Sequence, residues 1–209
     1  ELGIPHAGGL SMLVAQAKRS SEQFTGTVIG DEALGRVERT VNHRLRNIIL
    51  IGMPASGKTT VGRAVAQALS LPFHDCDREV ERLTGRTIPE IFAAEGEEAF
   101  RAVESRALAA LCTAEAPCVI ATGGGAVLTE QNRELLRRSG TVFWLDRDLE
   151  NIMSTDCSGR PLLSGGAEAL RTLYKNRRGL YAACAHLLVP DGTITQVTDY
   201  ILQTVKELL

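Results

Sequence analysis

The sequence contains no apolar run long enough to cross a bilayer, no closely spaced pair of cysteines and almost no net charge. A membrane-spanning helix needs roughly 20 consecutive apolar residues, and no basic segment followed by an apolar one opens the chain as in a secretory signal. The formal net charge of −2 provides no general attraction for nucleic acid or for an anionic membrane. We therefore expect neither as a partner, and any affinity for phosphate must be local.

The cysteines stand singly, with an odd total and no C-x-x-C motif: Cys76, Cys112, Cys118, Cys157 and Cys184. This pattern argues against a disulfide framework and against a zinc site. We interpret the cysteines as structural thiols of a protein that works in a reducing cytoplasm. Because the chain begins at Glu1 rather than methionine, we also expect it to be part of a longer protein or a processed product.

From residue 47 onward, short apolar segments alternate with segments of helical periodicity. Strands are predicted at 47–51, 71–77, 118–125, 141–146 and 185–190, and helices at 59–69, within 78–112, at 129–139 and at 195–209. The long helical region carries one apolar face, formed by Phe100, Val103, Ala107, Leu108 and Leu111. Strands that alternate with helices predict an α/β fold with a parallel sheet covered on both faces.

Three segments that contain glycine or acidic residues follow predicted strands: the turn at 52–60, "DCD" at 75–77 and "GGG" at 123–125. Ligands of parallel α/β sheets bind at the carboxyl ends of the strands. We therefore expect these three segments to border a single site.

Residues 1–46 do not follow the alternation and are predicted as a helical N-terminal extension to a domain at 47–209. An amphipathic helix is expected within 8–26, with Leu10, Leu13, Val14 and Ala17 on one face, and a second helix at 31–46. Two helices alone cannot bury their apolar faces. We expect them to pack on the rest of the chain, on another copy, or on a further partner domain.

Residues 52–59 match the phosphate-binding pattern G-x-x-x-x-G-K-[ST], directly after a predicted strand and before a predicted helix. The glycines allow backbone N–H groups to surround phosphate oxygens, and the helix N-terminus adds a partial positive charge. We predict that this loop binds ATP through Gly52, Ala55, Ser56, Gly57, Lys58, Thr59 and Thr60. Lys58 is expected to bridge the β- and γ-phosphates and Thr59 to coordinate Mg²⁺. The alternative is a glycine-rich turn that binds no nucleotide.

The segments "FHDCDREVERLTGRTIPEIFAAEGEEAFRAVE" (73–104) and "VIATGGGAV" (119–127) resemble shikimate kinase, and further motifs of that family extend the resemblance over 47–209. The resemblance implies a P-loop fold of the nucleoside-monophosphate-kinase type, with a parallel five-stranded sheet flanked by helices. It also implies ATP-dependent phosphorylation of the 3-hydroxyl of shikimate, a step in aromatic amino-acid biosynthesis. Two other interpretations are a gluconate-type kinase and a nucleotide-binding docking module without catalysis.

By the same resemblance, Asp75 holds the hydrated Mg²⁺, and Asp77 binds the ring hydroxyls of shikimate and orients or deprotonates the attacking one. We expect the side chains of these two aspartates to face opposite sides of the strand end, so that one can serve the metal and the other the acceptor. A solvated turn or a helix cap is the alternative for this pair.

The resemblance assigns Arg101 and Arg177 to the shikimate carboxylate, where a planar guanidinium makes paired charge-assisted hydrogen bonds. Glu104, three residues after Arg101, lies on the same helix face and is expected to hold Arg101 in place. Glycines 123, 124 and 125 match the family's substrate-contacting triplet, where a side chain would block the approach to the backbone. Apolar walls of the same pocket are expected from Ile88, Phe92 and Phe100.

The segment "CSGRPLLSGG" (157–166) is predicted to be a lid in which Arg160 covers the phosphates and stabilises charge on the transferred group. Three positions depart from the family's pattern: Ala55 replaces a usual glycine, Met153–Ser154 occupies the region of an adenine-packing arginine, and Gly179 replaces a common proline. These departures affect the expected nucleotide affinity and base discrimination more than the phosphate chemistry.

The segment "GIPHAGGLSMLVAQAKRSSEQFTG" is similar to the C-terminal end of shikimate dehydrogenase, with Gln16 at that family's substrate-contacting glutamine. This resemblance covers only residues 1–30, and no nicotinamide-binding motif is present in the chain. It implies a possible shikimate dehydrogenase domain as a covalent or docked partner, in a dehydrogenase–kinase fusion. A generic helical extension is the alternative.

Overall fold

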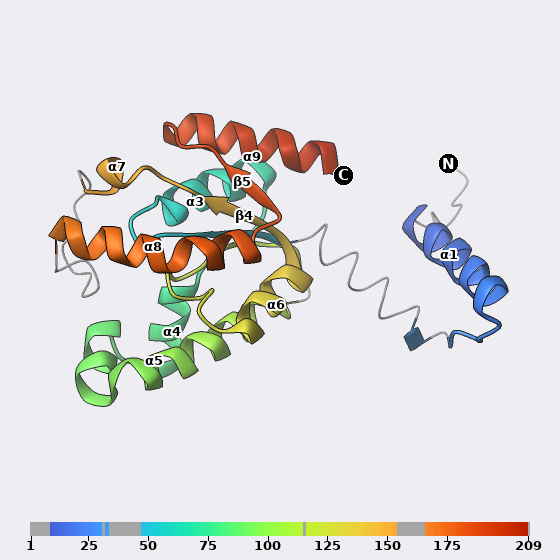
Figure 1. Cartoon of the computed structure of the whole chain (residues 1–209), viewed down its shortest axis with the longest axis horizontal. Coiled ribbons are helices and arrows are strands. Elements are labelled where there is room, and N and C mark those ends of the chain that lie inside the picture. Colours follow the sequence, from blue (N-terminus) through green and yellow to red (C-terminus); the bar gives the residue numbers. More distant parts are fainter. Residues whose placement is uncertain (1–8, 31, 34–46, 115, 154–165, 209) are drawn as a thin grey trace.

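The computed structural model describes residues 9–30, 32–33, 47–114, 116–153 and 166–208 (Figure 1). Three sequence predictions lie outside these residues: most of the second N-terminal helix, the lid with Arg160, and the thiol of Cys157. The side chains of Leu10, Leu13 and Val14 are likewise outside the description, although their backbone is helical.

Five parallel strands form a single sheet in the order β2-β3-β1-β4-β5, which confirms the predicted parallel α/β fold. The strands are β1 (Asn47–Gly52), β2 (Phe73–Asp75), β3 (Val119–Ala121), β4 (Gly140–Leu145) and β5 (Leu187–Val189). All six residues of the central strand β1 are buried, as expected for a strand that helices cover on both sides. Its alternate side chains therefore enter two different cores.

The helices divide between the two faces of the sheet (Figure 1). On one face, Ile48 and Leu50 of β1 pack against α3 (Lys58–Leu69) and α9 (Ile194–Leu208). On the other, Ile49 and Ile51 pack among residues of α4 (Cys76–Thr84), α5 (Ile88–Cys112), α6 (Glu130–Ser139), α7 (Leu149–Met153) and α8 (Gly166–Cys184). The predicted apolar face of the long helical region is confirmed, since four of its five residues are buried and Val103 is partly buried.

The helical region predicted within 78–112 consists of two helices, because Gly85 ends α4 in a left-handed conformation. A capping box then starts α5: the Thr87 backbone N–H donates to the Glu90 carboxylate over 2.7 Å. Gly96, with φ of +80°, introduces a kink inside α5. The two helices are therefore joined by the short turn at 85–87, whereas β2 leads into the other end of α4.

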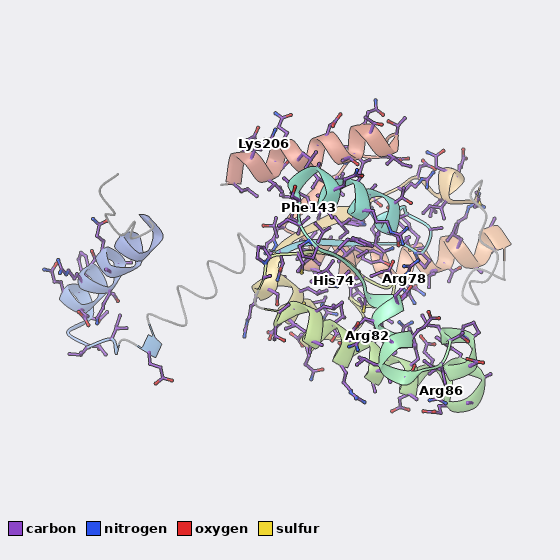
Figure 2. All side chains as sticks on the ribbon, turned by 180° about the vertical axis from the view of Figure 1, so that it is seen from behind. His74, Arg78, Arg82, Arg86, Phe143 and Lys206 are labelled. Carbon is purple, nitrogen blue, oxygen red and sulfur yellow. The ribbon has the colours of Figure 1, made fainter. Side chains whose placement is uncertain are left out.

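The outer side of α4 and the loop after it carry three exposed arginines, Arg78, Arg82 and Arg86 (Figure 2). Arg82 forms an ion pair with Glu79, and Arg86 forms one with Glu95. The carboxylates of Glu79 and Glu95 therefore offset much of the positive charge of these arginines.

The N-terminal helix α1 spans Gly9–Thr25, which confirms a helix within 8–26. Phe24 and Val28, in and just after this helix, are 91% and 86% exposed. The division of the chain into an extension at 1–46 and a domain at 47–209 stays a prediction. Among the described residues, none of the helices combines the length and the apolar character that a bilayer crossing requires.

Candidate active site

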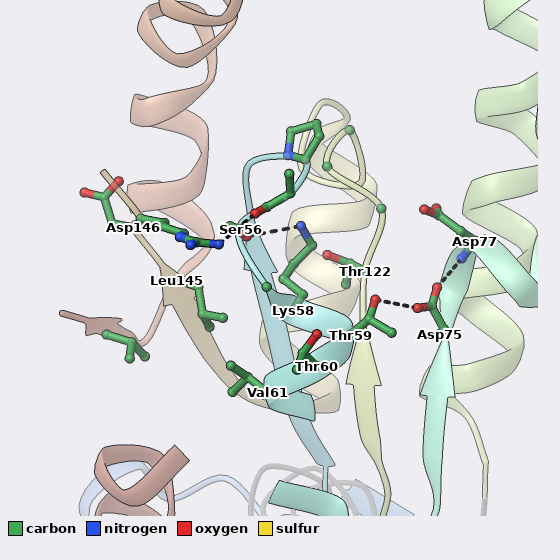
Figure 3. Close-up of a pocket in the computed structure, with 18 of the residues that line it drawn as sticks. Ser56, Lys58, Thr59, Thr60, Val61, Asp75, Asp77, Thr122, Leu145 and Asp146 are labelled. Carbon is green, nitrogen blue, oxygen red and sulfur yellow. Dashed lines mark hydrogen bonds between the residues drawn. The ribbon is translucent and has the colours of Figure 1, made fainter. Parts of the chain in front are cut away.

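One cavity of about 780 Å³ lies at the carboxyl ends of the strands (Figure 3). Its lining combines the loop after β1, Asp75 and Asp77 after β2, the glycines after β3, and residues that follow β4 and β5. The expectation that the three sequence segments border a single site is therefore confirmed. The parallel arrangement is the cause, because it brings every carboxyl strand end to the same edge of the sheet.

The loop between β1 and α3 is shaped as a phosphate-binding cradle. Gly57 precedes α3 with φ of +91°, and no side chain caps the first N–H groups of that helix. The Lys58 ammonium is buried and donates hydrogen bonds to the carbonyls of Gly52 and Met53 over 3.0 and 2.7 Å, and to the Ser56 hydroxyl over 3.4 Å. The loop thus presents uncapped N–H donors and a cation at the cavity, as a polyphosphate requires.

Ala55, one of the departures from the family pattern, adopts φ of +63°. A residue with a Cβ atom is strained in this left-handed region, at a cost of roughly 1–2 kcal/mol. The structure therefore explains why glycine is the usual residue here. Its carbonyl also accepts a 3.4 Å hydrogen bond from Arg147.

The two predicted metal ligands touch each other. The Thr59 hydroxyl donates to the Asp75 carboxylate over 2.7 Å (Figure 3). A hydroxyl and a carboxylate oxygen suit Mg²⁺, which keeps several waters and takes further oxygens from phosphates. Among the described residues, no group of three His, Cys, Asp or Glu side chains could hold a metal by itself. The donor set therefore fits a magnesium ion that arrives with a nucleotide.

The prediction that the two aspartates face opposite sides of a strand is wrong, because residues two apart in a strand share a face. Strand β2 ends at Asp75, and Asp77 lies in the first turn of α4. Asp75 caps this helix by accepting a 3.1 Å hydrogen bond from the Asp77 backbone N–H. The side chains do not alternate across a strand, and both residues line the same cavity. The alternative interpretation, a helix cap, is therefore also correct: Asp75 caps α4, and both aspartates still line the cavity.

Arg101 and Glu104 form an ion pair at the wall of the cavity. The guanidinium of Arg101 is 2.7 Å from Glu104 and 2.8 Å from Glu97. The Glu104 side chain is only 1% exposed, so this is no solvated surface pair. Burial raises the pKa of Glu104, although Arg101 opposes this shift. Burial alone would lower the pKa of Arg101, but the two carboxylates raise it overall, so the guanidinium stays charged and fixed.

The glycine triplet has to lack side chains because its neighbours occupy that space. A Cβ atom on Gly123 would overlap a Glu104 oxygen and would lie 2.9 Å from an Asp77 oxygen. One on Gly124 would lie 2.8 Å from the ring of Pro54, and one on Gly125 would overlap the Arg101 guanidinium. The triplet thus allows the charged side chains to approach the backbone closely. Its expected contact with substrate stays a prediction.

The second predicted arginine, Arg177, lies behind the triplet rather than in the cavity lining. Its buried guanidinium donates to the Gly124 carbonyl over 3.1 Å, whereas Arg101 lines the cavity directly. The three predicted apolar residues also line the cavity: Ile88, Phe92 and Phe100. The rings of Phe92 and Phe100 pack with centroids 4.7 Å apart.

Sequence reasoning missed a group of polar residues that follow β4 and β5 and also line the cavity: Asp146, Arg147 and Asp191. Asp191 accepts hydrogen bonds from the Asn151 side chain over 2.8 Å and from the Asp148 backbone over 3.0 Å. Burial tends to raise its pKa, but these hydrogen bonds lower it overall. The signal in the sequence was available, since "DRD" (146–148) begins at the last residue of the predicted fourth strand.

Four of the five cysteines are described, and all four are free and buried: Cys76, Cys112, Cys118 and Cys184. Burial raises the pKa of Cys112, Cys118 and Cys184 to about 11. These thiols stay protonated at neutral pH, and the interpretation of these four as structural thiols is confirmed.

Comparison with known proteins agrees with this geometry. A family model described as shikimate kinase matches residues 54–206. A shikimate kinase from Symbiobacterium thermophilum is 48% identical over 169 residues, 77% of this chain and 97% of that protein. One from Ruegeria pomeroyi is 40% identical over 173 residues, 78% of this chain and 88% of that protein. The solved structure of shikimate kinase from Acinetobacter baumannii in complex with shikimate is 37% identical, has a TM-score of 0.73, and matches 81% of this chain and 96% of that one. On the family model and these relatives, this chain belongs to the shikimate kinase family.

Proposed function

We propose that this chain transfers the γ-phosphoryl group of ATP, bound with Mg²⁺, to the 3-hydroxyl of shikimate, giving shikimate 3-phosphate and ADP. The observation that carries the proposal is the shared cavity, which is lined both by the phosphate loop and by Asp77, Arg101 and the glycine triplet. A nucleotide and a small hydroxy acid can bind there with their reacting groups adjacent. The related Acinetobacter baumannii enzyme was solved in complex with shikimate.

The nucleotide binds, in this proposal, to the loop residues Gly52, Ala55, Ser56, Gly57, Lys58, Thr59 and Thr60. Support comes from the uncapped N-terminus of α3 and from the Lys58 ammonium inside the loop. Thr59 and Asp75 would hold the magnesium ion, which when bound offsets charge on the β- and γ-phosphates. Lys58 would leave its loop carbonyls for the phosphate oxygens, exchanging neutral acceptors for charged ones.

Shikimate binds, in this proposal, at the end of the cavity that is lined by Asp77, Arg101 and the glycine triplet. Arg101 and Arg177 attract its carboxylate, and Asp77 accepts a hydrogen bond from the attacking hydroxyl and takes its proton during transfer. The contact of Arg177 with Gly124 O and that of Arg101 with Glu104 support a prearranged clamp. Arg177 needs a small rotation to reach the cavity, because it lies behind the triplet. The glycines at 123–125 let the ring approach the backbone.

Arg160 completes the proposed catalytic set with Lys58 and Asp77. It lies outside the described residues, so its role rests on the sequence. In phosphoryl transfer the protein contributes mainly position and charge, and a guanidinium over the transferred group offsets the charge that spreads onto its oxygens.

A coupled assay of ADP release with shikimate, quinate and gluconate as acceptors tests the proposal, with Lys58→Ala as the inactive control. Turnover with shikimate at a kcat/KM at least tenfold above that with quinate or gluconate is expected. Preferred turnover with gluconate would instead indicate a gluconate-type kinase. Nucleotide binding without turnover on any acceptor would indicate a docking module and contradict the proposal.

We also propose that residues 1–30 are the end of a shikimate dehydrogenase domain, joined covalently or docked. Support comes from the sequence motif around Gln16, from the helix α1, and from the exposed apolar side chains of Phe24 and Val28. The gene upstream of these residues provides the test. A nicotinamide-binding domain encoded there is expected, and its absence would leave only a helical extension.

We propose that the reaction takes place in the cytoplasm. Support comes from the free thiols, which a reducing compartment maintains. Measurement of kinase activity in cell fractions is the test, and activity confined to a secreted fraction would contradict it.

A further inference from the structure

The carbonyl of Gly124 is held by two side chains from the same helix. The Tyr181 hydroxyl donates to it over 2.6 Å, and the Arg177 guanidinium donates over 3.1 Å. Both donors come from α8, more than 50 residues away in sequence. Neither Tyr181 nor Arg177 lines the cavity, whereas Gly124 does. The carbonyl is therefore directed away from the cavity, toward α8.

Among the described residues, the other two carbonyls of the triplet have only local backbone partners. Gly123 O accepts from Ala126 N over 3.2 Å, and Gly125 O accepts from Leu128 N over 3.0 Å. These turns bend the chain but do not attach it to another element. The link to α8 consequently passes through Gly124 O.

The direction of this carbonyl determines the direction of the next N–H group. The described chain contains no cis peptide bonds, and in a trans peptide the C=O and N–H point in opposite directions. With Gly124 O directed toward α8, the Gly125 N–H faces the cavity side. Within the described residues, it donates to no other backbone group outside regular helices and strands. A donor that faces a cavity next to Arg101 suits an anionic or hydroxyl oxygen of a ligand.

Tyr181 is well placed to keep this orientation. Its side chain is fully buried, and its ring stacks on Trp144 of β4 with centroids 5.9 Å apart and an interplanar angle of 26°. Burial raises the pKa of Tyr181 to about 12, although Arg177 opposes the shift. The hydroxyl therefore remains a donor throughout the pH range in which enzymes work.

We propose that Tyr181 is a positioning residue for the acceptor substrate. Through Gly124 O it sets the peptide between Gly124 and Gly125, so that the Gly125 N–H is presented to shikimate. It also holds the shared carbonyl that locates Arg177. This inference rests on the proposed function, but it goes beyond it by assigning a role to a residue that neither touches substrate nor lines the cavity.

Tyr181→Phe tests the inference, because it removes the hydroxyl and keeps the ring on Trp144. Loss of one buried hydrogen bond predicts a rise in the KM for shikimate of roughly three- to tenfold. The KM for ATP should change less than about twofold, since the Tyr181 hydroxyl reaches the described phosphate loop only through a 3.9 Å hydrogen bond to the Met53 sulfur. An unchanged KM for shikimate would overturn the proposal. An equal rise in both KM values would also overturn it, because it would indicate a general structural effect.

Tyr200→Phe is the matched control. Tyr200 lies on α9, is 39% exposed and makes no hydroxyl hydrogen bond to another described residue. The same chemical change should leave both KM values unaltered there. The chain's single tryptophan, Trp144, provides an independent reading, since its fluorescence should change on shikimate addition. The dissociation constant from this signal should rise in Tyr181→Phe and stay unaltered in Tyr200→Phe.

A measurement on the unsubstituted protein keeps the proposal testable if the Tyr181→Phe variant fails to fold. In protein labelled with ¹⁵N-glycine, shikimate should shift the assigned Gly125 amide resonance more than that of Gly85, which ends α4. Equal or absent shifts would overturn the proposed role of this N–H. If the unsubstituted enzyme phosphorylates other acceptors but not shikimate, the proposed function fails instead, and the two failures are thus distinguishable.

Discussion

In the phosphate loop Gly52 and Gly57 adopt φ of +148° and +91°, whereas the glycines at 123–125 all lie outside the positive range. A Cβ atom on Gly57 would meet open space, but one on any member of the triplet would strike a neighbouring side chain. At Gly57 the loop therefore needs glycine for its backbone direction alone, and the triplet needs glycine for volume. Gly52 needs it for both reasons, since a Cβ atom there would lie 2.6 Å from the Leu145 carbonyl oxygen. Two glycine-rich segments of one cavity thus depend on the residue for different physical reasons.

The difference matches what each end of the cavity has to bind. Phosphate oxygens are met by N–H groups that the left-handed turns aim inward. The acceptor end instead brings charged side chains close to the backbone, with Arg101, Glu104 and Asp77 around the triplet. A substitution at Gly57 should consequently act through conformation or nucleotide binding, and one at Gly123 or Gly125 through the position of Glu104 or Arg101.

The largest effect is expected for Lys58→Ala. Removing the cation that we propose to contact the transferred phosphoryl group should lower kcat by roughly 100- to 1,000-fold or more, by analogy with the loss of one stabilising donor elsewhere. The loss should be similar for every acceptor that the enzyme uses, since Lys58 belongs to the phosphate end. Steady-state kinetics measure it, and a variant with kcat within tenfold of the original would contradict the role of the loop.

Gly125→Ala should act on the acceptor end alone. The added methyl group displaces the end of the flexible Arg101 side chain, so the fold should survive while a charge-assisted hydrogen bond to the carboxylate is lost. Such bonds contribute about 1.5–3 kcal/mol, which predicts a rise in the KM for shikimate of roughly 10- to 100-fold. The KM for ATP and the melting temperature should change little. An equal rise in the KM for ATP would show that the phosphate loop and the glycine triplet do not serve separate ends of the cavity.

Glu104→Gln should alter how stability depends on pH. The raised pKa of Glu104 means that the folded state holds a proton more tightly than the unfolded state, whose value is near 4.5. As pH rises from about 4.5 through the folded pKa, unfolding releases protons and the free energy of unfolding contributed by this group falls. Glutamine does not titrate, so the stability of the original protein relative to the variant should decline over this range. Thermal unfolding at several pH values measures the difference, and a constant difference would show that Glu104 does not titrate as described.

The smallest effects are expected for a pair of loop substitutions with opposite signs. Ala55→Gly should raise the free energy of unfolding by up to about 1 kcal/mol by relieving the positive φ, while Gly57→Ala should lower it by roughly 1–2 kcal/mol. Both are readily measured by chemical denaturation. If both substitutions changed the free energy of unfolding in the same direction, backbone direction would not explain why the loop uses glycine.

Much of this site was predictable because its motifs are local. The phosphate loop, the aspartates after β2 and the glycines after β3 each occupy a few consecutive residues, and a parallel sheet necessarily brings them to one edge. The prediction failed for the faces of the two aspartates. Residues two apart in a strand share a face, so opposite faces did not follow for Asp75 and Asp77 even from a strand, and Asp77 belongs to α4 rather than to β2.

The sequence by itself determined the alternation of elements and the phosphate loop, because periodicity and backbone conformation depend on neighbours along the chain. Only the tertiary structure decided the strand order, the burial of Glu104 and the attachment of Gly124 to α8. Those features join residues that are more than 50 positions apart or depend on which helix covers a given side chain. No local pattern encodes such pairs, since packing of the whole domain selects them.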